Sequence, residues 1–217
     1  MLQTSTDQPS GNALTPRQKA VLDAALDLMV EAGDQLTMTA VAKRASCSKE
    51  TLYKWFGDRD GLLTATVRWQ ASRVRVPTVD RARMDMAQLT ATLEQFASDW
   101  LTVITSKTSI ALNRVAVGHA GSAKRGLGTI VLENGRFALA ERLKPVLLAA
   151  REAGLISFDD AETAFRTFFG LVARDVQMRV LLGEKLKLSE ADIQADARRA
   201  THQFLTLHRS TDGAKGS

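Results

Sequence analysis

Apolar residues recur at helical spacing along most of this 217-residue chain, and no convincing strand-like alternation interrupts them. The first helix is predicted to begin at Thr15, because Thr15, Pro16 and Gln18 match an N-cap, a first helical position and a capping box. Gly33 suits the C-terminal end of that helix. The pattern therefore predicts an all-α fold with a well-defined first helix.

Two short helices joined by a tight turn are predicted next. Thr37 opens the first, the Ser46-Cys47 pair forms the turn, and Ser48 caps the second, which runs from Lys49 to Phe56. A longer supporting helix followed by two such short helices is the spacing of a helix-turn-helix unit.

The rest of the chain alternates long helical segments with short connections. A helix capped by Asp58 is expected to continue past Trp69, the stretch before Gly135 is less regular, and Pro145 is expected to kink a later helix. The later predicted helices cover residues 89–104, 109–119, 137–150, 159–182 and 189–208. We place domains at 15–62 and 63–209, with polar, disordered tails at 1–14 and 210–217.

The composition narrows the class of protein. With 45% hydrophobic and 24% charged residues the chain can build an ordinary core, and no apolar run approaches the ~20 residues that cross a bilayer. Cys47 is the one cysteine, which excludes an internal disulfide; buried packing is its expected role, with a redox switch as the alternative. The N-terminus does not match a secretory leader, so we expect a soluble cytoplasmic protein.

Motifs for catalysis, metal binding and phosphate loops are lacking in the sequence. The three histidines show no paired ligand spacing, and neither a nucleophile elbow nor a Gly-rich phosphate loop occurs. We therefore predict that the protein is not an enzyme and uses no metal and no cofactor.

The formal charge of +5 is unevenly distributed. Residues 1–66 carry seven Lys and Arg against eight Asp and Glu, whereas residues 67–125 carry nine against four. The two short helices are nevertheless locally basic. The arginines that follow the fourth helix are interpreted as favouring its C-terminus and solubility, with attraction of an acidic effector or of distant DNA as the alternative.

The second short helix has an outward face suited to reading a DNA groove. A helical wheel turns Leu52 and Phe56 inward and Lys54 outward, with Thr51 and Tyr53 on the flanks. Ammonium and hydroxyl groups bind base edges and phosphates, while methyl and aromatic groups touch thymine methyls. The free backbone N–H groups at the helix start also favour a phosphate.

The stretch LTMTAVAKRASCSKETLYKWFGDRDGLL resembles the DNA-binding region of TetR/AcrR-type transcriptional regulators, and the last 80 or so residues resemble the C-terminal domain of the AefR-like branch. The resemblance implies a three-helix DNA-binding domain, a helical domain that binds an effector and dimerises, and a homodimer. By position it implies DNA contacts from Thr37, Thr39, Lys43, Arg44, Ser48, Lys49, Glu50, Thr51, Tyr53, Lys54, Trp55 and Arg59.

Two residues depart from the pattern of this family. Ser46 stands at the usual turn glycine, so the turn is expected to differ slightly. Glu50 stands at a common glycine and places an acid on the reading face, where it could accept from cytosine N4 or repel phosphate and sharpen selection.

Aromatic and polar residues of the second domain are candidates for an effector pocket, although any one aromatic residue is more often core. Asn113 and His119 lie on apolar stripes, so we hypothesise that they contact a moderately hydrophobic effector. Asp175 could instead form a dimer salt bridge with Arg174 or Arg179. The predicted effector-binding residues are Trp69, Phe96, Trp100, Asn113, Val117, His119, Phe137, Phe168 and Asp175.

The last two helices are the predicted dimer interface. Residues 165–182 are apolar on more than one face, and residues 193–207 form a seam containing small side chains. The predicted interface residues are Phe165, Leu171, Met178, Leu182, Ile193, Ala197, Ala200 and Phe204.

These observations lead to the hypothesis of a ligand-responsive transcriptional repressor. It would bind a palindromic double-stranded operator as a homodimer and be released by a small-molecule effector, with no membrane partner. A constitutive DNA-binding protein without an effector is one alternative, and a helical small-molecule carrier without DNA binding is another.

Overall fold

The computed structural model describes residues 14–33, 36–77, 83–120 and 126–210. These residues form helices, together with one isolated bridge between Ile156 and Arg209. The expected tails lie outside the described residues, apart from Leu14 and Ser210. The helices are α1 Pro16–Ala32, α2 Met38–Arg44, α3 Lys49–Phe56, α4 Arg59–Ala71, α5 Met86–Thr105, α6 Lys107–Gly118, α7 Leu127–Val131, η2 Leu132–Phe137, α8 Ala138–Glu152, α9 Ala161–Ala173, α10 Val176–Leu181 and α11 Glu190–Leu207.

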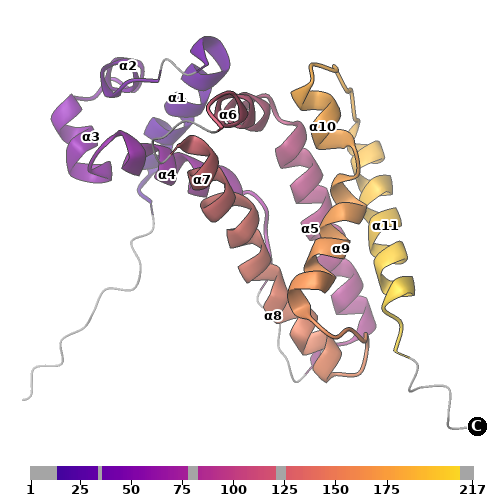
Figure 1. Cartoon of the computed structure of the whole chain (residues 1–217). Coiled ribbons are helices and arrows are strands. Elements are labelled where there is room, and N and C mark those ends of the chain that lie inside the picture. Colours follow the sequence, from indigo (N-terminus) through magenta and orange to yellow (C-terminus); the bar gives the residue numbers. More distant parts are fainter. Residues whose placement is uncertain (1–13, 34–35, 78–82, 121–125, 211–217) are drawn as a thin grey trace, which may run out of the picture.

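Helices α1–α3 and the start of α4 form a small N-terminal unit, which we call the head, at one end of the molecule (Figure 1). The predicted capping box of Thr15 and Gln18 is present, and α1 ends at Gly33. Thr37 and Ser48 accept the backbone N–H groups of Ala40 and Thr51 at 3.1 Å, which caps α2 and α3. Asp58 caps α4 in the same way, so the predicted starts of all four helices are confirmed.

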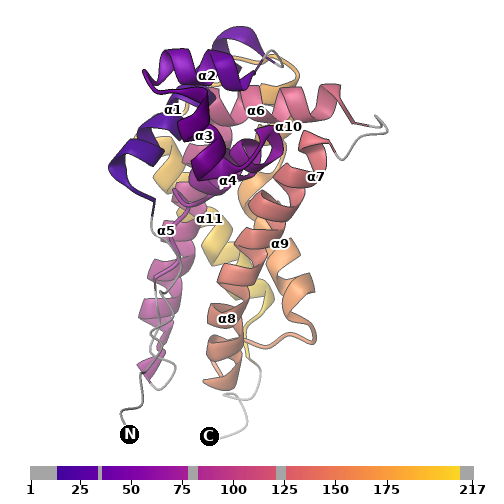
Figure 2. The same cartoon turned by 90° about the vertical axis from the view of Figure 1, so that its left-hand side faces the viewer.

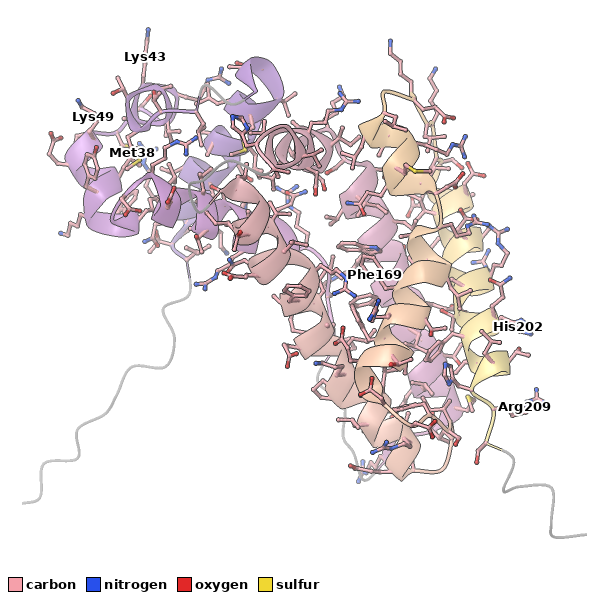
Figure 3. The ribbon with its side chains drawn as sticks, viewed as in Figure 1. Met38, Lys43, Lys49, Phe169, His202 and Arg209 are labelled. Atoms are coloured by element: carbon pink, nitrogen blue, oxygen red, sulfur yellow. The ribbon has the colours of Figure 1, made fainter. Side chains whose placement is uncertain are left out.

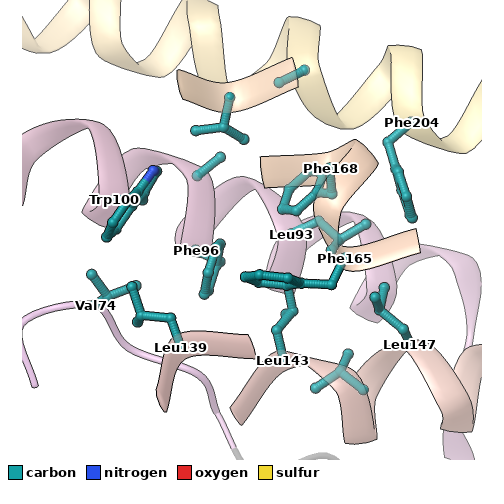
Figure 4. Packing of buried hydrophobic residues seen from close by; sticks show 14 of the residues in the cluster. Val74, Leu93, Phe96, Trp100, Leu139, Leu143, Leu147, Phe165, Phe168 and Phe204 are labelled. Carbon is teal, nitrogen blue, oxygen red and sulfur yellow. The ribbon is translucent and has the colours of Figure 1, made fainter. Parts of the chain in front are cut away.

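The second part of the chain is built from the long helices α5, α8, α9 and α11 (Figure 2). Its core is rich in phenylalanine: Phe96, Phe165, Phe168 and Phe204 have no exposed surface (Figure 4). Phe168 packs on Phe96 and on Phe204 with ring centroids 6.0 and 5.1 Å apart. Helix α6 lies across the top of this body, between α1 and α10 (Figure 1).

The expected helix over residues 159–182 is two helices. Arg174 adopts a left-handed backbone conformation with φ 41°, which ends α9 and separates it from α10. Such a conformation is costly for a residue with a side chain. The Arg174 guanidinium lies 3.1 Å from the carboxylate of Asp196 on α11, a tertiary contact that the helical pattern could not reveal.

The stretch that we expected to be irregular, up to Gly135, contains the short helix α7 and the start of a π-helical segment, η2, while residues 121–125 lie outside the described residues. The amide of Asn134 donates to the carbonyl of Ile130 at 3.1 Å, so the side chain takes part of the bonding that a regular helix backbone would supply. The side-chain oxygen of Asn134 accepts a hydrogen bond of 2.7 Å from the guanidinium of Arg68 on α4. The π segment is therefore held directly against α4.

A second contact joins α4 to α8. The guanidinium of Arg142 donates to the carbonyl oxygens of Ala71 at 2.9 Å and Val74 at 3.1 Å, where α4 ends. Burial lowers the pKa of Arg142, and these carbonyls stabilise its charge. Helix α4 also passes without a break through the domain boundary that we placed at residues 62 and 63.

Candidate nucleic-acid interface and internal cavity

The turn between α2 and α3 sets the angle of the helix pair. Ser46 has φ 50°, the left-handed conformation that a glycine would adopt without cost. The guanidinium of Arg17, from α1, donates to the carbonyl oxygens of Ala45 at 2.7 Å and Ser46 at 2.8 Å. Arg17 therefore holds the turn from outside, and sequence reasoning missed this role because the contact spans 28 residues.

Helix α3 presents the face that the helical wheel predicts. Leu52 is fully buried, whereas the Tyr53 side chain is 51% exposed. Lys43, Lys49 and Lys54 are exposed and form no ion pair with a described residue. Figure 3 shows Lys43 and Lys49 projecting outward from α2 and α3. These amines are available to phosphate or to base edges.

The polar residues at the ends of this helix pair are arranged around the caps. Thr37 and Ser48 use their hydroxyls as N-caps, and the Ser48 and Thr51 hydroxyls lie 3.0 Å apart. Thr39 is exposed on the first turn of α2. Backbone and Ser48 hydrogen bonds lower the pKa of Glu50, so this carboxylate is charged at neutral pH.

Two predicted phosphate donors, Arg44 and Arg59, have polar partners within the chain, and a third, Trp55, has a ring contact. Arg44 forms a bidentate ion pair with Glu31, which raises the pKa of Arg44. Arg59 donates to the Leu36 carbonyl at 3.2 Å. Trp55 is half-buried, with its ring edge against Phe56. These contacts give Arg44, Arg59 and Trp55 a structural role in the head.

The start of α4 lies unusually close to the end of α3. A methyl group added to Gly61 would overlap the carbonyl oxygen of Phe56, so only glycine fits at this position. The close contact between Gly61 and the Phe56 carbonyl therefore fixes the end of α3 against the first turn of α4.

A cavity of about 190 Å³ lies between α4, α5, α6, the π segment and α9. Its walls are mainly apolar, with a few polar side chains among them. From α4 it is lined by Val67, Gln70 and Ala71. The other lining residues are Trp100, Val103, Ile104, Ser109, Leu112, Asn113, Val131, Leu132, Gly135, Arg136, Leu139, Phe169 and Gln177.

Two of the predicted effector-binding residues, Trp100 and Asn113, line this cavity. Phe96 and Phe168 are instead fully buried in the core, which corrects their assignment, because neither ring reaches the cavity. Trp69 lines a different groove, and its indole donates to Asp23 of α1 at 2.7 Å.

The remaining effector candidates lie outside the cavity as well. Val117 and Phe137 are exposed in other grooves, and His119 is exposed at the end of α6. Asp175 is exposed and forms an ion pair with Arg179 at 3.7 Å. Helical spacing placed these residues beside apolar neighbours but could not show which side of the helix would be packed.

Four residues predicted for the dimer interface are used by the chain itself. Ala197, Ala200 and Phe204 of α11, with Phe165 of α9, are buried in the single-chain core, which corrects their assignment. Met178 and Leu182 are 59% and 82% exposed, and Leu171 and Ile193 are half-buried.

Sequence reasoning missed four polar residues of the cavity, Gln70, Ser109, Arg136 and Gln177. Gln70 follows Leu63 by seven and Val67 by three positions, so it is a polar residue on an apolar stripe, the same pattern that pointed to Asn113. Arg136 lies on the π segment, where regular helical spacing does not apply.

A capped helix pair with an exposed basic face, resting on a supporting helix, defines a helix-turn-helix DNA-binding protein. In the part of the chain that the structure describes, no group of three His, Cys, Asp or Glu residues could hold a metal ion. None of the described helices has the length and hydropathy that a membrane crossing requires.

The comparisons with known proteins identify the family. Residues 21–66 match the family model "Bacterial regulatory proteins, tetR family", and residues 91–209 match "AefR-like transcriptional repressor, C-terminal domain". The chain therefore belongs to the TetR family of DNA-binding transcriptional regulators. The fold and family are those of regulators rather than of enzymes.

Individual relatives agree with this assignment. A TetR transcriptional regulator from Agrobacterium tumefaciens is 45% identical, with a TM-score of 0.77 over 91% of this chain and 97% of that chain. The flavonoid-responsive regulator FrrA is 26% identical, with a TM-score of 0.65 over 90% and 98%. The uncharacterized HTH-type transcriptional regulator YdeS of Bacillus subtilis (strain 168) is 34% identical over 80 residues, which cover 36% of this chain and 40% of YdeS.

Proposed function

We propose that this protein is a ligand-responsive repressor that binds a palindromic operator as a homodimer and is released by a small molecule. One observation carries the proposal: α4 lines the cavity with Val67, Gln70 and Ala71, while its first turn supports the head through Gly61. A molecule in the cavity would touch the same helix that positions α3. The similarity to an AefR-like repressor domain supports the direction of regulation.

The head would read DNA through two groups of residues. Lys49, Tyr53 and Lys54 are the exposed side chains of α3 that can reach base edges and nearby phosphates, with Thr51 on the flank. Thr39 and Lys43 would hold the backbone, together with the helix starts capped by Thr37 and Ser48. Arg44, Trp55 and Arg59 contribute by keeping the head rigid.

Glu50 gives the reading surface a selective element. Its carboxylate is ionised, so it repels phosphate and can accept a hydrogen bond from cytosine N4. A negative charge that weakens binding to non-operator sequences raises specificity for the operator more than affinity for it.

Two copies of the head are needed for a palindrome. Recognition helices of a dimer occupy half-sites separated by about 34–36 Å, one helical turn of DNA, or a multiple of it. Leu171, Met178, Leu182 and Ile193 are the interface candidates that remain accessible on the single chain. We expect the protein to act in the cytoplasm, where it would meet its operator.

The proposal is tested by measuring the affinity of the protein and its variants for a DNA duplex that the full-length protein selects from a random-sequence pool. We expect Lys54→Ala to weaken binding by roughly tenfold and to reduce the salt slope by about 1, because a cation at the DNA surface is lost. Lys187→Ala removes an exposed lysine outside the head and is the matched control. The same titration should give two chains per duplex. Equal affinities of the two variants would contradict the proposal.

The alternatives make different predictions. A constitutive DNA-binding protein would keep its operator affinity with every compound that occupies the cavity. A carrier without DNA binding would select no duplex from the pool. FrrA is described as flavonoid-responsive, and its similarity in fold favours a response to an aromatic molecule here.

A further inference from the structure

The cavity beside α4 has the size of a single aromatic ring with a small substituent. Its volume is about 190 Å³. A protein cavity of about 150 Å³ is enough to hold benzene. A guest with two or three fused or linked rings would have to extend beyond this volume.

The walls favour a flat guest. The rings of Trp100 and Phe169 lie with centroids 5.0 Å apart, and both line the cavity. The guanidinium of Arg136 lies 5.4 Å from the Phe169 centroid. Figure 3 shows Phe169 on the side of α9 that faces α8. Aromatic faces and edges of this kind pack well against another ring.

Two buried polar groups on the cavity walls lack partners. Gln70 is 4% exposed; its amide nitrogen donates to the Ser106 hydroxyl at 3.2 Å, but its oxygen accepts from no described residue. Trp100 is 7% exposed, and its indole N–H likewise has no described acceptor. Buried polar groups in proteins are nearly always paired, so each of these needs an explanation.

One acceptor and one donor together match a hydroxyl group. A hydroxyl donates one hydrogen bond and accepts others, which makes it the smallest group that suits both an amide oxygen and an indole N–H. Both atoms are buried, so each side chain has to turn for its polar atom to meet a guest.

The charge of the lining excludes one class of guest. None of the described lining residues is an Asp or Glu, and Arg136 is the charged residue among them. Arg136 lies 3.8 Å from the carboxylate of Glu162, which is not a lining residue of the cavity. A cationic molecule would meet a positive charge with no carboxylate to bind it.

We propose that the effector is a compact, single-ring aromatic molecule that carries a hydroxyl group and no positive charge. This inference rests on the proposed function, since it names the class of molecule that would act on α4. Gln70 and Trp100 are the residues that would distinguish the hydroxyl from a methyl group of similar size.

The test compares phenol with toluene on the full-length protein, using isothermal titration calorimetry and, separately, release of the selected duplex. The two probes have the same number of non-hydrogen atoms. A purely apolar cavity would prefer toluene, because burying an unpaired hydroxyl is unfavourable. We expect the reverse, with phenol binding about tenfold more tightly.

The variants Trp100→Phe and Gln70→Met should remove most of this preference, measured as the ratio of phenol affinity to toluene affinity in the same variant. Trp69→Phe is the matched control, because the Trp69 indole bonds to Asp23 outside the cavity. Having two variants on different helices protects the test against the misfolding of one.

The outcomes separate the class of effector from the proposed function. If toluene binds as tightly as phenol, or if both variants weaken the two probes equally, the hydroxyl assignment is overturned. If a three-ring flavone releases DNA and phenol does not, the repressor proposal stands and the single-ring class falls. If phenol binds with the expected preference without affecting DNA, the cavity assignment stands and ligand-responsive repression falls.

Discussion

The head and the second domain differ in the contacts that shape their functional surfaces. In the head, each helix begins with a side chain that caps its own first turn, and Arg17 reaches from α1 to hold the strained turn at Ser46. In the second domain, phenylalanine rings from helices far apart in sequence pack on each other. A DNA-reading surface needs fixed helix angles, which the helix caps and the Arg17 hydrogen bonds provide. A ligand-binding domain needs a solid core beside a cavity, which only long-range packing can provide.

The contrast is sharpest between two neighbouring residues of α9. Phe168 is fully buried among other aromatic rings, whereas Phe169 is half-buried on the cavity wall. A phenylalanine side chain therefore packs the core at one position and lines the cavity at the next, because successive residues of a helix point in different directions.

The largest expected effect separates these two residues. Phe168→Ala should lower the free energy of unfolding by about 3–5 kcal/mol, because a cavity forms where no neighbour can relax. Phe169→Ala enlarges an existing cavity at a partly exposed site and should cost about 1–2 kcal/mol. Urea denaturation of both variants measures the difference. Equal losses would show that the cavity wall is packed as tightly as the core.

A smaller effect tests the short-range contacts of the head. Gly61→Ala should lower the free energy of unfolding by about 2–3 kcal/mol and reduce operator affinity, because the new methyl group forces the start of α4 away from Phe56. Gly118→Ala, where a methyl group meets no neighbour, is the control. Thermal denaturation and duplex binding give the two readouts. A stable Gly61→Ala variant with full affinity would mean that the angle of α3 does not depend on this contact.

The smallest expected effect is a gain. Ser46→Gly should raise the free energy of unfolding by about 0.5–1 kcal/mol, since glycine adopts the left-handed conformation without a steric cost. Ser72→Gly provides the contrast, because Ser72 has ordinary right-handed dihedral angles and its hydroxyl donates to the Trp69 carbonyl at 2.7 Å, so glycine should lower the free energy of unfolding there. Chemical denaturation resolves a change of this size. A loss of stability in Ser46→Gly would show that the serine hydroxyl matters more than its backbone strain.

The sequence predicts those parts of the molecule that depend on neighbouring residues. The caps at Thr15, Thr37, Ser48 and Asp58 are confirmed because each needs only its own helix. The wheel of α3 correctly buries Leu52 because a short helix has one inner face.

Features that depend on distant partners were not predictable in this way. The break at Arg174 involves Asp196 on another helix, and the π segment places Asn134 against Arg68 from α4. For the same reason the aromatic residues of the core and of the cavity wall, such as Phe168 and Trp100, could not be told apart from spacing alone.

The π segment also determines how α4 and α8 can move relative to each other. Its bonding accommodates about one more residue per turn than an α-helix does. A return to α-helical bonding would rotate the following helix by about 100° and advance it by about 1.5 Å. Asn134 bonds to Arg68 in the last turn of α4, and Arg142 bonds to Ala71 and Val74 where α4 ends, so both contacts hold the C-terminal part of α4. The extra residue of the π segment thus lies in a continuous α7–η2–α8 helix that is bonded to α4 through both Asn134 and Arg142. A return to α-helical bonding must therefore break one of these two contacts or turn α4 together with α8.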